Sequence, residues 1–401
     1  MPTKQSISTK YLNKYGHAGH LPSNVQKNWQ SVVIVPICGE SVACIEHLTS
    51  VVNSPRYLIV ACVNRPSNHP KSTQWRSLNS KLITQLQNQA LKVITLDNGY
   101  LLSYHGFDIW LLDFNGQAFH HNQGVGLARK IAADSALKLI SDGAVRNPWI
   151  FSTDADVQLP VNYFEVTDAS VDCVAFSLAF KHESKSDELL YWQALYDFKL
   201  YYYQQAMQYI GTVYDYIPLG SCLVIGADAY AKVRGFPIRS GGEDFYLLNK
   251  LAKIGTIAQP EAPIIKIKAR LSQRVPFGTG PALLKIKDKP EAVGYYHPRI
   301  FAEIKQWYQQ LKDYFRHQKY PDNSLINSMW QIEHIIHQAI QQTKTADRWQ
   351  QFVLEWFDAF KILKTVHALE TEFPRLGLNE LKELQLFCEL TEGLVIPGWG
   401  E

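Results

Sequence analysis

Two aspartates, Asp154 and Asp156, lie two positions apart directly after an apolar run at residues 149–153. Such a run predicts a buried strand, so both carboxylates would lie where that strand ends. Carboxylates placed in this way can bind one Mg²⁺ or Mn²⁺, whose other positions are then taken by water and substrate phosphates. Capping of a helix or a solvated turn is the alternative interpretation, because aspartate is common in both.

A second acidic pair, Glu243 and Asp244, follows Gly241 and Gly242 at the start of a predicted helix. The glycines would let the backbone approach a ligand, and a carboxylate there could act as a general base. The alternative is that both acids only stabilise the positive end of the helix dipole, which requires no substrate. The segment is therefore a candidate catalytic segment.

Two arginines, Arg270 and Arg274, flank Ser272 shortly before a Gly-Thr-Gly turn at residues 278–280. Guanidinium groups bind phosphate oxygens strongly, and the backbone N–H groups of such a turn can add to that binding. The segment is thus a candidate diphosphate-binding loop. A surface loop with ordinary solvated arginines is the alternative.

The elements that must position these residues alternate along the chain. Strands are predicted at residues 31–37, 57–63, 92–96, 108–114, 149–153, 171–180, 217–225 and 262–269, and those at 31–37, 57–63 and 149–153 are expected to be buried. Helices are predicted at residues 75–89, 124–140, 187–210, 227–234 and 245–254. This alternation predicts an α/β fold with a mainly parallel sheet flanked by helices. Ligands of such folds bind at the carboxyl ends of the strands, where Asp154 and Asp156 are expected.

We expect three parts along the chain: a polar leader at residues 1–27, a large domain at 28–284 and a helical region at 285–401. The last part has apolar residues at helical spacing, which predicts a C-terminal all-helical appendage. It could cover the large domain or form a homodimer contact. The aromatic residues of the predicted helix 187–210 serve either core packing or the wall of an acceptor site.

Composition narrows the classes of function. The chain of 401 residues has 40 lysines and arginines against 37 aspartates and glutamates, which gives no support to nucleic-acid binding. The six cysteines form no Cys-x-x-Cys pair and are expected to be reduced core residues of a cytoplasmic protein. No apolar run is long enough to span a membrane, and peripheral contact at the inner membrane surface is a second interpretation.

Two weaker patterns carry less chemistry. The segment at residues 124–130 lacks the third glycine of a dinucleotide fingerprint and does not follow the first strand, which argues against a Rossmann dehydrogenase. His334 and His337 lie one helical turn apart, as a zinc pair would, but no further ligand run accompanies them. We expect His334 and His337 to lie on a solvated face of a helix.

Four short motifs occur in the following order along the chain: Val35-Pro36-Ile37-Cys38-Gly39-Glu40, Gly126-Leu127-Ala128-Arg129, Ser152-Thr153-Asp154-Ala155-Asp156 and Gly242-Glu243-Asp244. In this order the chain resembles the family 2 glycosyltransferases of the GT-A fold over residues 31–283. The motifs are similar to that family's Pro-x-x-x-Glu end of the first strand, its Ala-Arg helix, its Asp-x-Asp motif and its acceptor-side Glu-Asp motif. The resemblance implies that residues 28–284 are a nucleotide-sugar-binding catalytic domain.

On the donor side, the resemblance implies that Pro36 and Glu40 shape the nucleoside pocket and that Arg129 lies near the nucleotide. It also implies that Asp154 and Asp156 hold the ribose and a Mn²⁺ or Mg²⁺ ion on the donor diphosphate.

On the acceptor side, the resemblance implies that Asp244, beside Glu243, is the base. One segment departs from the family: Asn64 stands where a pair of aspartates is usual after the second strand, which leaves the donor's base open. Asn64 could still hydrogen-bond a base edge. Some related enzymes use a late histidine as a metal ligand, for which His297 is the candidate.

We therefore expect a metal-dependent inverting glycosyltransferase, with a hexose as the expected sugar, that uses a nucleotide diphosphate donor. Its acceptor, whether a saccharide, a lipid or a small metabolite, is not encoded in these motifs. A sugar nucleotidyltransferase is one alternative, although its usual Gly-rich phosphate loop after the first strand is missing. A non-catalytic nucleotide-sugar-binding protein is the other, and the presence of both acidic pairs argues against it.

Overall fold

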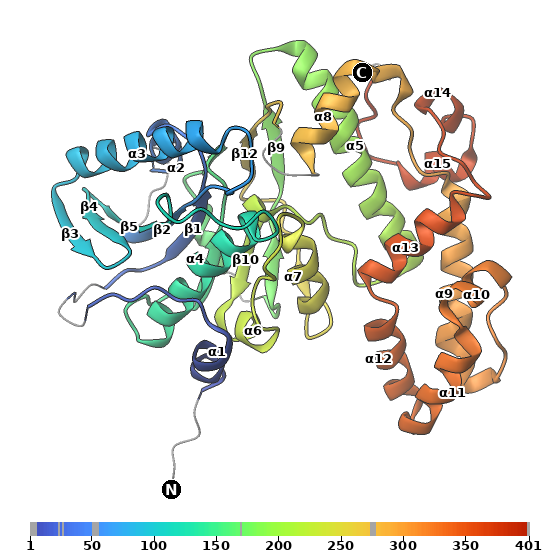
Figure 1. Cartoon of the computed structure of the whole chain (residues 1–401). Helices are drawn as coiled ribbons and strands as arrows, with labels where there is room; N and C mark the ends of the chain where they lie inside the picture. The colour runs from blue at the N-terminus through green and yellow to red at the C-terminus, as the bar shows by residue number, and fades with distance from the viewer. Residues whose placement is uncertain are drawn as a thin grey trace, which may run out of the picture. The chain divides into compact units, whose positions relative to one another are not determined.

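The computed structural model describes residues 6–22, 25, 28–49, 56–168, 171–272 and 278–398. The chain forms two compact units. We name Met1–Ser186 with Pro218–Pro281 the sheet unit, and Asp187–Ile217 with Ala282–Glu401 the helical unit. Figure 1 shows both units and labels most of their strands and helices.

The sheet unit is built on a nine-stranded sheet in the order β11-β8-β10-β6-β1-β2-β5-β4-β3. The strands are β1 Val32–Ile37, β2 Tyr57–Val63, β3 Lys92–Leu96, β4 Gly99–Ser103, β5 Phe107–Asp113, β6 Trp149–Ser152, β8 Ala175–Ser177, β10 Leu223–Gly226 and β11 Ile257–Ala258. The central strands β6, β1, β2 and β5 are parallel, and antiparallel pairs flank them on both sides. The predicted α/β fold with a mainly parallel sheet flanked by helices is confirmed.

The centre of this sheet fixes where the candidate residues lie. All seven residues of β2 are buried, as expected of a parallel strand covered on both faces. Ile34 of β1 is paired with Ser152 of β6, so the two strands end at the same edge. The loops that carry Glu40 and Asp154 both begin at this edge.

A second sheet of three strands, in the order β7-β12-β9, continues from that edge. Its strands are β7 Val157–Gln158, β9 Phe180–Glu183 and β12 Ile265–Lys268. The backbone N–H of Lys268 donates to the carbonyl of Asp156 over 3.0 Å. Because Arg270 follows two residues later, β12 brings it to the turn that contains Asp156.

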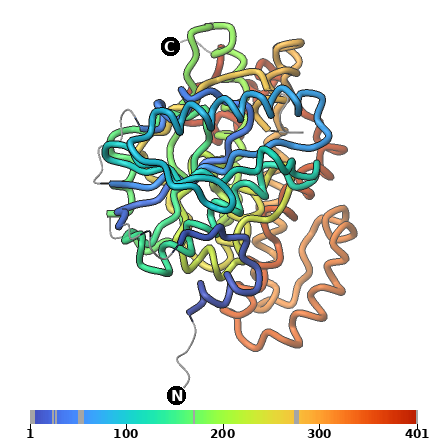
Figure 2. Tube along the Cα trace, turned by 60° about the vertical axis from the view of Figure 1, so that its left-hand side comes forward, coloured from blue at the N-terminus to red at the C-terminus, as the bar shows by residue number. Residues whose placement is uncertain are grey.

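The helices of the sheet unit are α1 Ile7–Tyr15, α2 Ala43–Thr49, α3 Ser72–Gln89, α4 Gly124–Ser141, α6 Ala227–Lys232 and α7 Glu243–Leu251. The expected polar leader contains one of them, α1, which lies beside α6 (Figures 1 and 2). Tyr11 of α1 donates to the buried Asp134 of α4 over 2.7 Å and packs edge-to-face on Tyr230 of α6. The N-terminal helix is therefore a packed part of the sheet unit.

The helical unit contains α5 Asp187–Ile210, α9 Pro298–His317, α10 Ser324–Trp330, α11 Ile332–Gln342, α12 Ala346–Trp356, α13 Ala359–Leu369, α14 Leu378–Leu381 and α15 Gln385–Leu390. One more helix, α8 Thr279–Asp288, begins in the last residues of the sheet unit and continues into the helical unit along the chain. The C-terminal helices predicted from the sequence are thus present.

The aromatic helix α5 groups with the helical unit, whereas the sequence placed residues 187–217 in the large domain. The physical reason is aromatic packing: Phe198 and Tyr202 both contact Phe387 of α15, and Tyr202 also contacts Phe301 of α9. For these buried rings, core packing is the role that the structure shows.

The strand predictions differ from the structure in several places. The run at 171–180 forms two strands, β8 and β9, because the chain changes from one sheet to the other between them. The run at 217–225 becomes a strand only at Leu223, since Gly220–Cys222 form a 3₁₀ turn. β4, β7 and β11 were not predicted, and β4 pairs with the edge strand β3 on one side and with β5 on the other.

The cysteines are all unbridged, and Cys44, Cys62 and Cys222 lie in the core as expected. Cys388 is exposed, so the prediction of a core residue was wrong there: its helix α15 has only six residues and buries one side. Among the described residues, none of the helices is both long and apolar enough to cross a membrane.

A core substitution tests the position of β2. Ile59 is fully buried, so Ile59→Ala should lower the free energy of unfolding by about 2–5 kcal/mol through lost burial and a cavity. Ile264 is 49% exposed, so Ile264→Ala should change the free energy of unfolding by less than about 1 kcal/mol. Urea unfolding of both variants measures the difference. Equal losses would contradict the central position of β2.

Candidate active site

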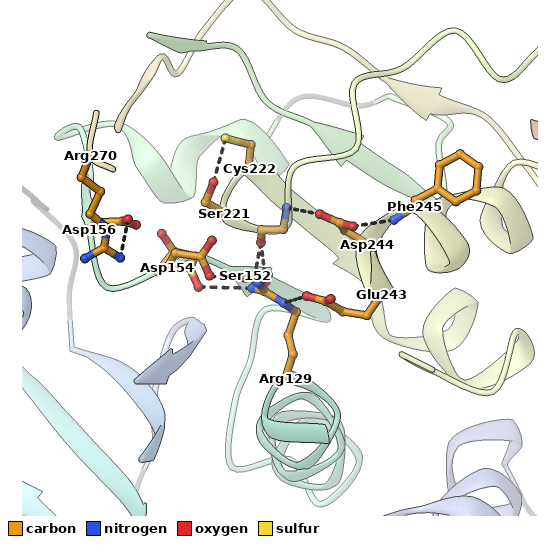
Figure 3. Close-up of polar contacts among 12 residues, drawn as sticks. Arg129, Ser152, Asp154, Asp156, Ser221, Cys222, Glu243, Asp244, Phe245 and Arg270 are labelled. Atoms are coloured by element: carbon orange, nitrogen blue, oxygen red, sulfur yellow. Dashed lines mark hydrogen bonds and ion pairs between the residues drawn. The ribbon is translucent and has the colours of Figure 1, made fainter. Parts of the chain in front are cut away.

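The guanidinium of Arg129 lies at the centre of the candidate site (Figure 3). Arg129 belongs to the first turns of α4 and is only 3% exposed. Its Nη2 donates to Oδ1 of Asp154 over 2.9 Å, and its Nε donates to Oε1 of Glu243 over 2.9 Å. One side chain therefore joins the acid after β6 to the acid that begins α7.

The third nitrogen of this guanidinium binds the end of β6 and the 3₁₀ turn before β10. Its Nη1 donates to Oγ of Ser152 and to the carbonyl of Gly220, each over 3.0 Å. Ser152 in turn donates to the same carbonyl over 2.8 Å. A Cβ atom at position 220 would lie 2.5 Å from Nη2 of Arg129, so only glycine leaves room for the guanidinium.

The charge state of Arg129 follows from these contacts. Burial acts to lower its pKa, but the carboxylates of Asp154 and Glu243 outweigh burial and raise it above the ordinary arginine value. Arg129 is thus a permanent buried cation. Removing either partner would leave a buried charge without compensation, which is strongly unfavourable.

Asp244 lies in the first turn of α7, next to Glu243. Gly242 precedes the helix with a φ of 70°, a left-handed conformation that favours glycine. The carboxylate of Asp244 accepts hydrogen bonds from the backbone N–H of Gly220 over 2.8 Å and of Phe245 over 2.7 Å. Gly220 thus contacts Asp244 through its N–H and Arg129 through its carbonyl.

The pKa of Asp244 is raised to about 7. Burial is the largest cause and the neighbouring Glu243 carboxylate is the second, while Arg129 opposes both. A carboxyl group with a pKa near neutrality is suited to accept and release a proton at physiological pH. Because this pKa lies above the ordinary value, the ionised carboxylate costs folding stability at neutral pH.

A second ion-pair group lies on the other side of Asp154 (Figure 3). Arg270 uses two nitrogens for two carboxylates: Nη2 lies 2.6 Å from Oδ2 of Asp156, and Nη1 donates to Oε1 of Glu40 over 2.8 Å. Burial raises the pKa of Asp156 to about 6, with Arg270 lowering it and the Asp154 and Glu40 carboxylates raising it further. The three carboxylates are therefore close enough to interact.

The donor set suits a divalent cation that is completed by a substrate. Among the described residues, no cluster of three or more His, Cys, Asp and Glu side chains could hold a metal ion by itself. Asp154 and Asp156, separated by Ala155, lie in the segment between β6 and β7 and offer carboxylate oxygens. Mg²⁺ commonly binds through one or two carboxylates together with substrate phosphates, so these two residues fit such an ion.

Three further residues were predicted to lie on the donor side: Pro36, Asn64 and Arg274. Pro36 lies half-buried on β1, in register with Cys62 of β2. The side-chain amide of Asn64 is buried and donates to the carbonyls of Ile37 and Cys62, so it ties the ends of β1 and β2 together. Arg274 lies outside the described residues.

The histidines have local roles. His297 caps α9, and its Nδ1 accepts a hydrogen bond from the backbone N–H of Arg299 over 3.1 Å. Burial and the nearby Arg299 lower its pKa. His334 and His337 are both exposed on α11, and neither belongs to a cluster of metal-ligating side chains in the described part of the chain.

Sequence reasoning gave no role to two parts of the site, Ser152 and Gly220. Ser152 gave no signal because a serine at the end of a buried strand has many structural uses. Gly220 did give one, since it interrupts an apolar run, and a glycine within a strand pattern often marks the close approach of another group. That group is the guanidinium of Arg129.

Comparison with known proteins gives structural alignments only. No family model and no curated protein sequence matches the chain. The mannosyltransferase PcManGT from Pyrobaculum calidifontis, solved in complex with GDP-Man and Mn²⁺, is 12% identical at a TM-score of 0.35, over 91% of this chain and 92% of that one. A mycobacterial protein is 9% identical at a TM-score of 0.30, over 70% of this chain and 75% of that one.

The bifunctional glycosyltransferase WbbM, in its apo form, is 10% identical at a TM-score of 0.30, over 61% of this chain and 40% of that one. Two of these three structures are described as glycosyltransferases. At this level of similarity, the chemistry of the site has to be argued from the chain's own residues.

A glycine substitution tests the central contact. Gly220→Ala should push the new methyl group against the Arg129 guanidinium and lower the free energy of unfolding by about 1–3 kcal/mol. Gly116 is the matched control, because a Cβ there would meet nothing within 4 Å, and Gly116→Ala should have no such cost. Thermal unfolding compares the two. If both variants unfold like the parent, Arg129 does not lie against Gly220.

Proposed function

We propose that the protein is a metal-dependent inverting glycosyltransferase that moves a sugar, with a hexose expected, from a nucleotide diphosphate donor to a hydroxyl acceptor. One observation supports this proposal above the others: buried Arg129 joins Asp154 of the donor-side motif to Glu243 of the acceptor-side motif. Asp244 lies directly beside Glu243. A cation site and a proton acceptor would thereby be held in a fixed relation, as sugar transfer requires.

Charge supports the need for a metal ion on the donor side. Two guanidiniums, of Arg129 and Arg270, face five carboxylates in this group, namely those of Glu40, Asp154, Asp156, Glu243 and Asp244. Such a group repels a diphosphate unless a further cation enters. We assign Mn²⁺ or Mg²⁺ to Asp154 and Asp156, where it would neutralise the charge that develops on the leaving diphosphate.

The other donor-side roles are assigned from the sequence motifs. Pro36 and Glu40, at the end of β1, are assigned to the nucleoside, with Arg270 and Arg274 assigned to the diphosphate. Asn64 is assigned to a base edge, although its amide N–H groups already bind backbone carbonyls. A base contact would then use its carbonyl oxygen.

On the acceptor side, Asp244 is assigned as the base that removes the proton of the attacking hydroxyl. Its raised pKa suits this role, because a stronger base accepts the proton more readily. Glu243 would serve by holding Arg129 rather than by proton transfer, since its carboxylate is buried in that ion pair. A single displacement inverts the anomeric carbon and forms no covalent intermediate.

The acceptor class stays open among saccharides, lipids and small metabolites. A homodimer through the C-terminal helices, a cytoplasmic location and peripheral contact with the inner membrane surface belong to the same proposal. None of these assignments changes the chemistry assigned to the site.

A donor screen tests the reaction class. The protein is incubated with nucleotide sugars and Mn²⁺, and release of nucleoside diphosphate is followed with and without chelator. We expect slow donor hydrolysis that stops when the metal is removed and that falls strongly in Asp156→Asn. Release of pyrophosphate would instead indicate a nucleotidyltransferase, and binding of a donor without turnover would indicate a binding protein.

The pH profile tests the base. Below about pH 7 Asp244 becomes protonated and can no longer accept a proton, so kcat/KM should fall about tenfold per pH unit on the acid side. Asp244→Asn should lower kcat by about 10²–10⁴-fold. Asp97→Asn, at an exposed turn, is the control and should leave the profile unchanged. A product that retains the anomeric configuration, seen by NMR, would contradict the assignment.

A further inference from the structure

We propose that Arg270 competes with the divalent cation for Asp156, and that the donor diphosphate relieves this competition by offering Arg270 another anion. The inference rests on the metal and donor part of the proposed function. It predicts that metal and nucleotide bind cooperatively, with one arginine as the coupling residue.

The first step is the geometry of Arg270. This residue bridges two carboxylates from different loops, Asp156 after β6 over 2.6 Å and Glu40 after β1 over 2.8 Å. A guanidinium binding two separate carboxylates acts as a local cation between them. It already stands at one of the two carboxylates assigned to the metal ion.

The second step is electrostatic. A divalent cation on Asp156 would lie within a few ångströms of the Arg270 guanidinium, and the two positive charges repel. The metal ion must therefore overcome both the ion pair and this repulsion. In contrast, when Arg270 is removed, Glu40, Asp154 and Asp156 face one another with fewer positive charges between them, which favours a bound cation.

The third step separates Arg270 from Arg129. The Arg129 side chain is 3% exposed and is held by Ser152 at the end of β6, by the carbonyl of Gly220 and by two acids, so it has no freedom to change partners. The Arg270 side chain is 33% exposed and holds only carboxylate partners among the contacts described above. A half-buried arginine of this kind can rotate toward a new anion at modest cost.

The fourth step concerns the new anion. A diphosphate offers several oxygens that match the planar fork of a guanidinium, and arginine–phosphate pairs are among the stronger charge-assisted hydrogen bonds. When Arg270 moves from Asp156 to the diphosphate, the carboxylate is released for the metal ion. The same movement places a positive charge on the leaving group.

Metal binding without turnover tests this inference. Mn²⁺ alone is titrated into the full-length protein, and bound Mn²⁺ is measured by electron paramagnetic resonance. We expect Arg270→Gln to bind Mn²⁺ at least about fivefold more tightly than the parent protein, at the lower end of typical coupling between sites. Arg270→Lys should fall between the two, because an ammonium keeps the charge but cannot bridge both carboxylates in the same way.

A second titration measures the diphosphate. With Mg²⁺ saturating, GDP and UDP should bind Arg270→Gln more weakly than the parent, so the cooperativity between metal and nucleotide shrinks. Arg375→Gln is the matched control: Arg375 also forms a two-nitrogen ion pair, with Glu370, and is 39% exposed, but lies in the helical unit. It should leave both affinities unchanged.

The outcomes are distinct. Unchanged or weaker Mn²⁺ binding in Arg270→Gln, or an equal gain in Arg375→Gln, would overturn the competition. Tighter Mn²⁺ binding in Arg270→Gln alone would support it even if the donor screen finds no sugar transfer. Failure of the proposed function and failure of this inference are thereby distinguishable.

Discussion

The buried guanidinium of Arg129 is the interaction on which the rest of the site depends. A cation that is 3% exposed is strongly unfavourable unless acids and carbonyls surround it. Here these partners come from the end of β6, from the 3₁₀ turn before β10 and from the start of α7. Since the guanidinium is planar and rigid, Asp154 and Glu243 cannot shift independently of each other. The proposed donor and acceptor sides are thereby linked by one side chain.

Arg129 and Arg270 bind different carboxylates of the site and differ in burial. Arg129 fixes geometry from within the core, whereas Arg270 is partly exposed and bridges Asp156 and Glu40 at the end of the sheet. Burial is the largest cause of the raised pKa values of Asp156 and Asp244, and the neighbouring carboxylates raise them further while the arginines oppose both. An excess of negative charge beside a proposed diphosphate site is the physical reason that a metal ion fits the chemistry.

The sheets explain how residues far apart in the sequence come to one place. Parallel pairing of β1 with β6 brings the loops of Glu40 and Asp154 to the same edge. The antiparallel strand β10, next to β6, brings Gly220 into contact with Arg129. The three-stranded sheet then adds Arg270 through β12. Each contribution uses the end of a strand, where the backbone leaves the sheet and side chains can converge.

The sequence by itself determined the α/β class, most strand positions and the identity of the two acidic pairs, because burial and turn chemistry are local properties that leave periodic patterns. It did not determine the partners. That Arg129 binds Glu243, that Arg270 binds Asp156, and that α5 packs with the C-terminal helices are contacts between distant segments. They depend on strand order and on packing between distant elements, and the position of Arg129 also depends on the close approach that Gly220 allows. Only the tertiary structure decides these, since no local pattern records which charges will meet.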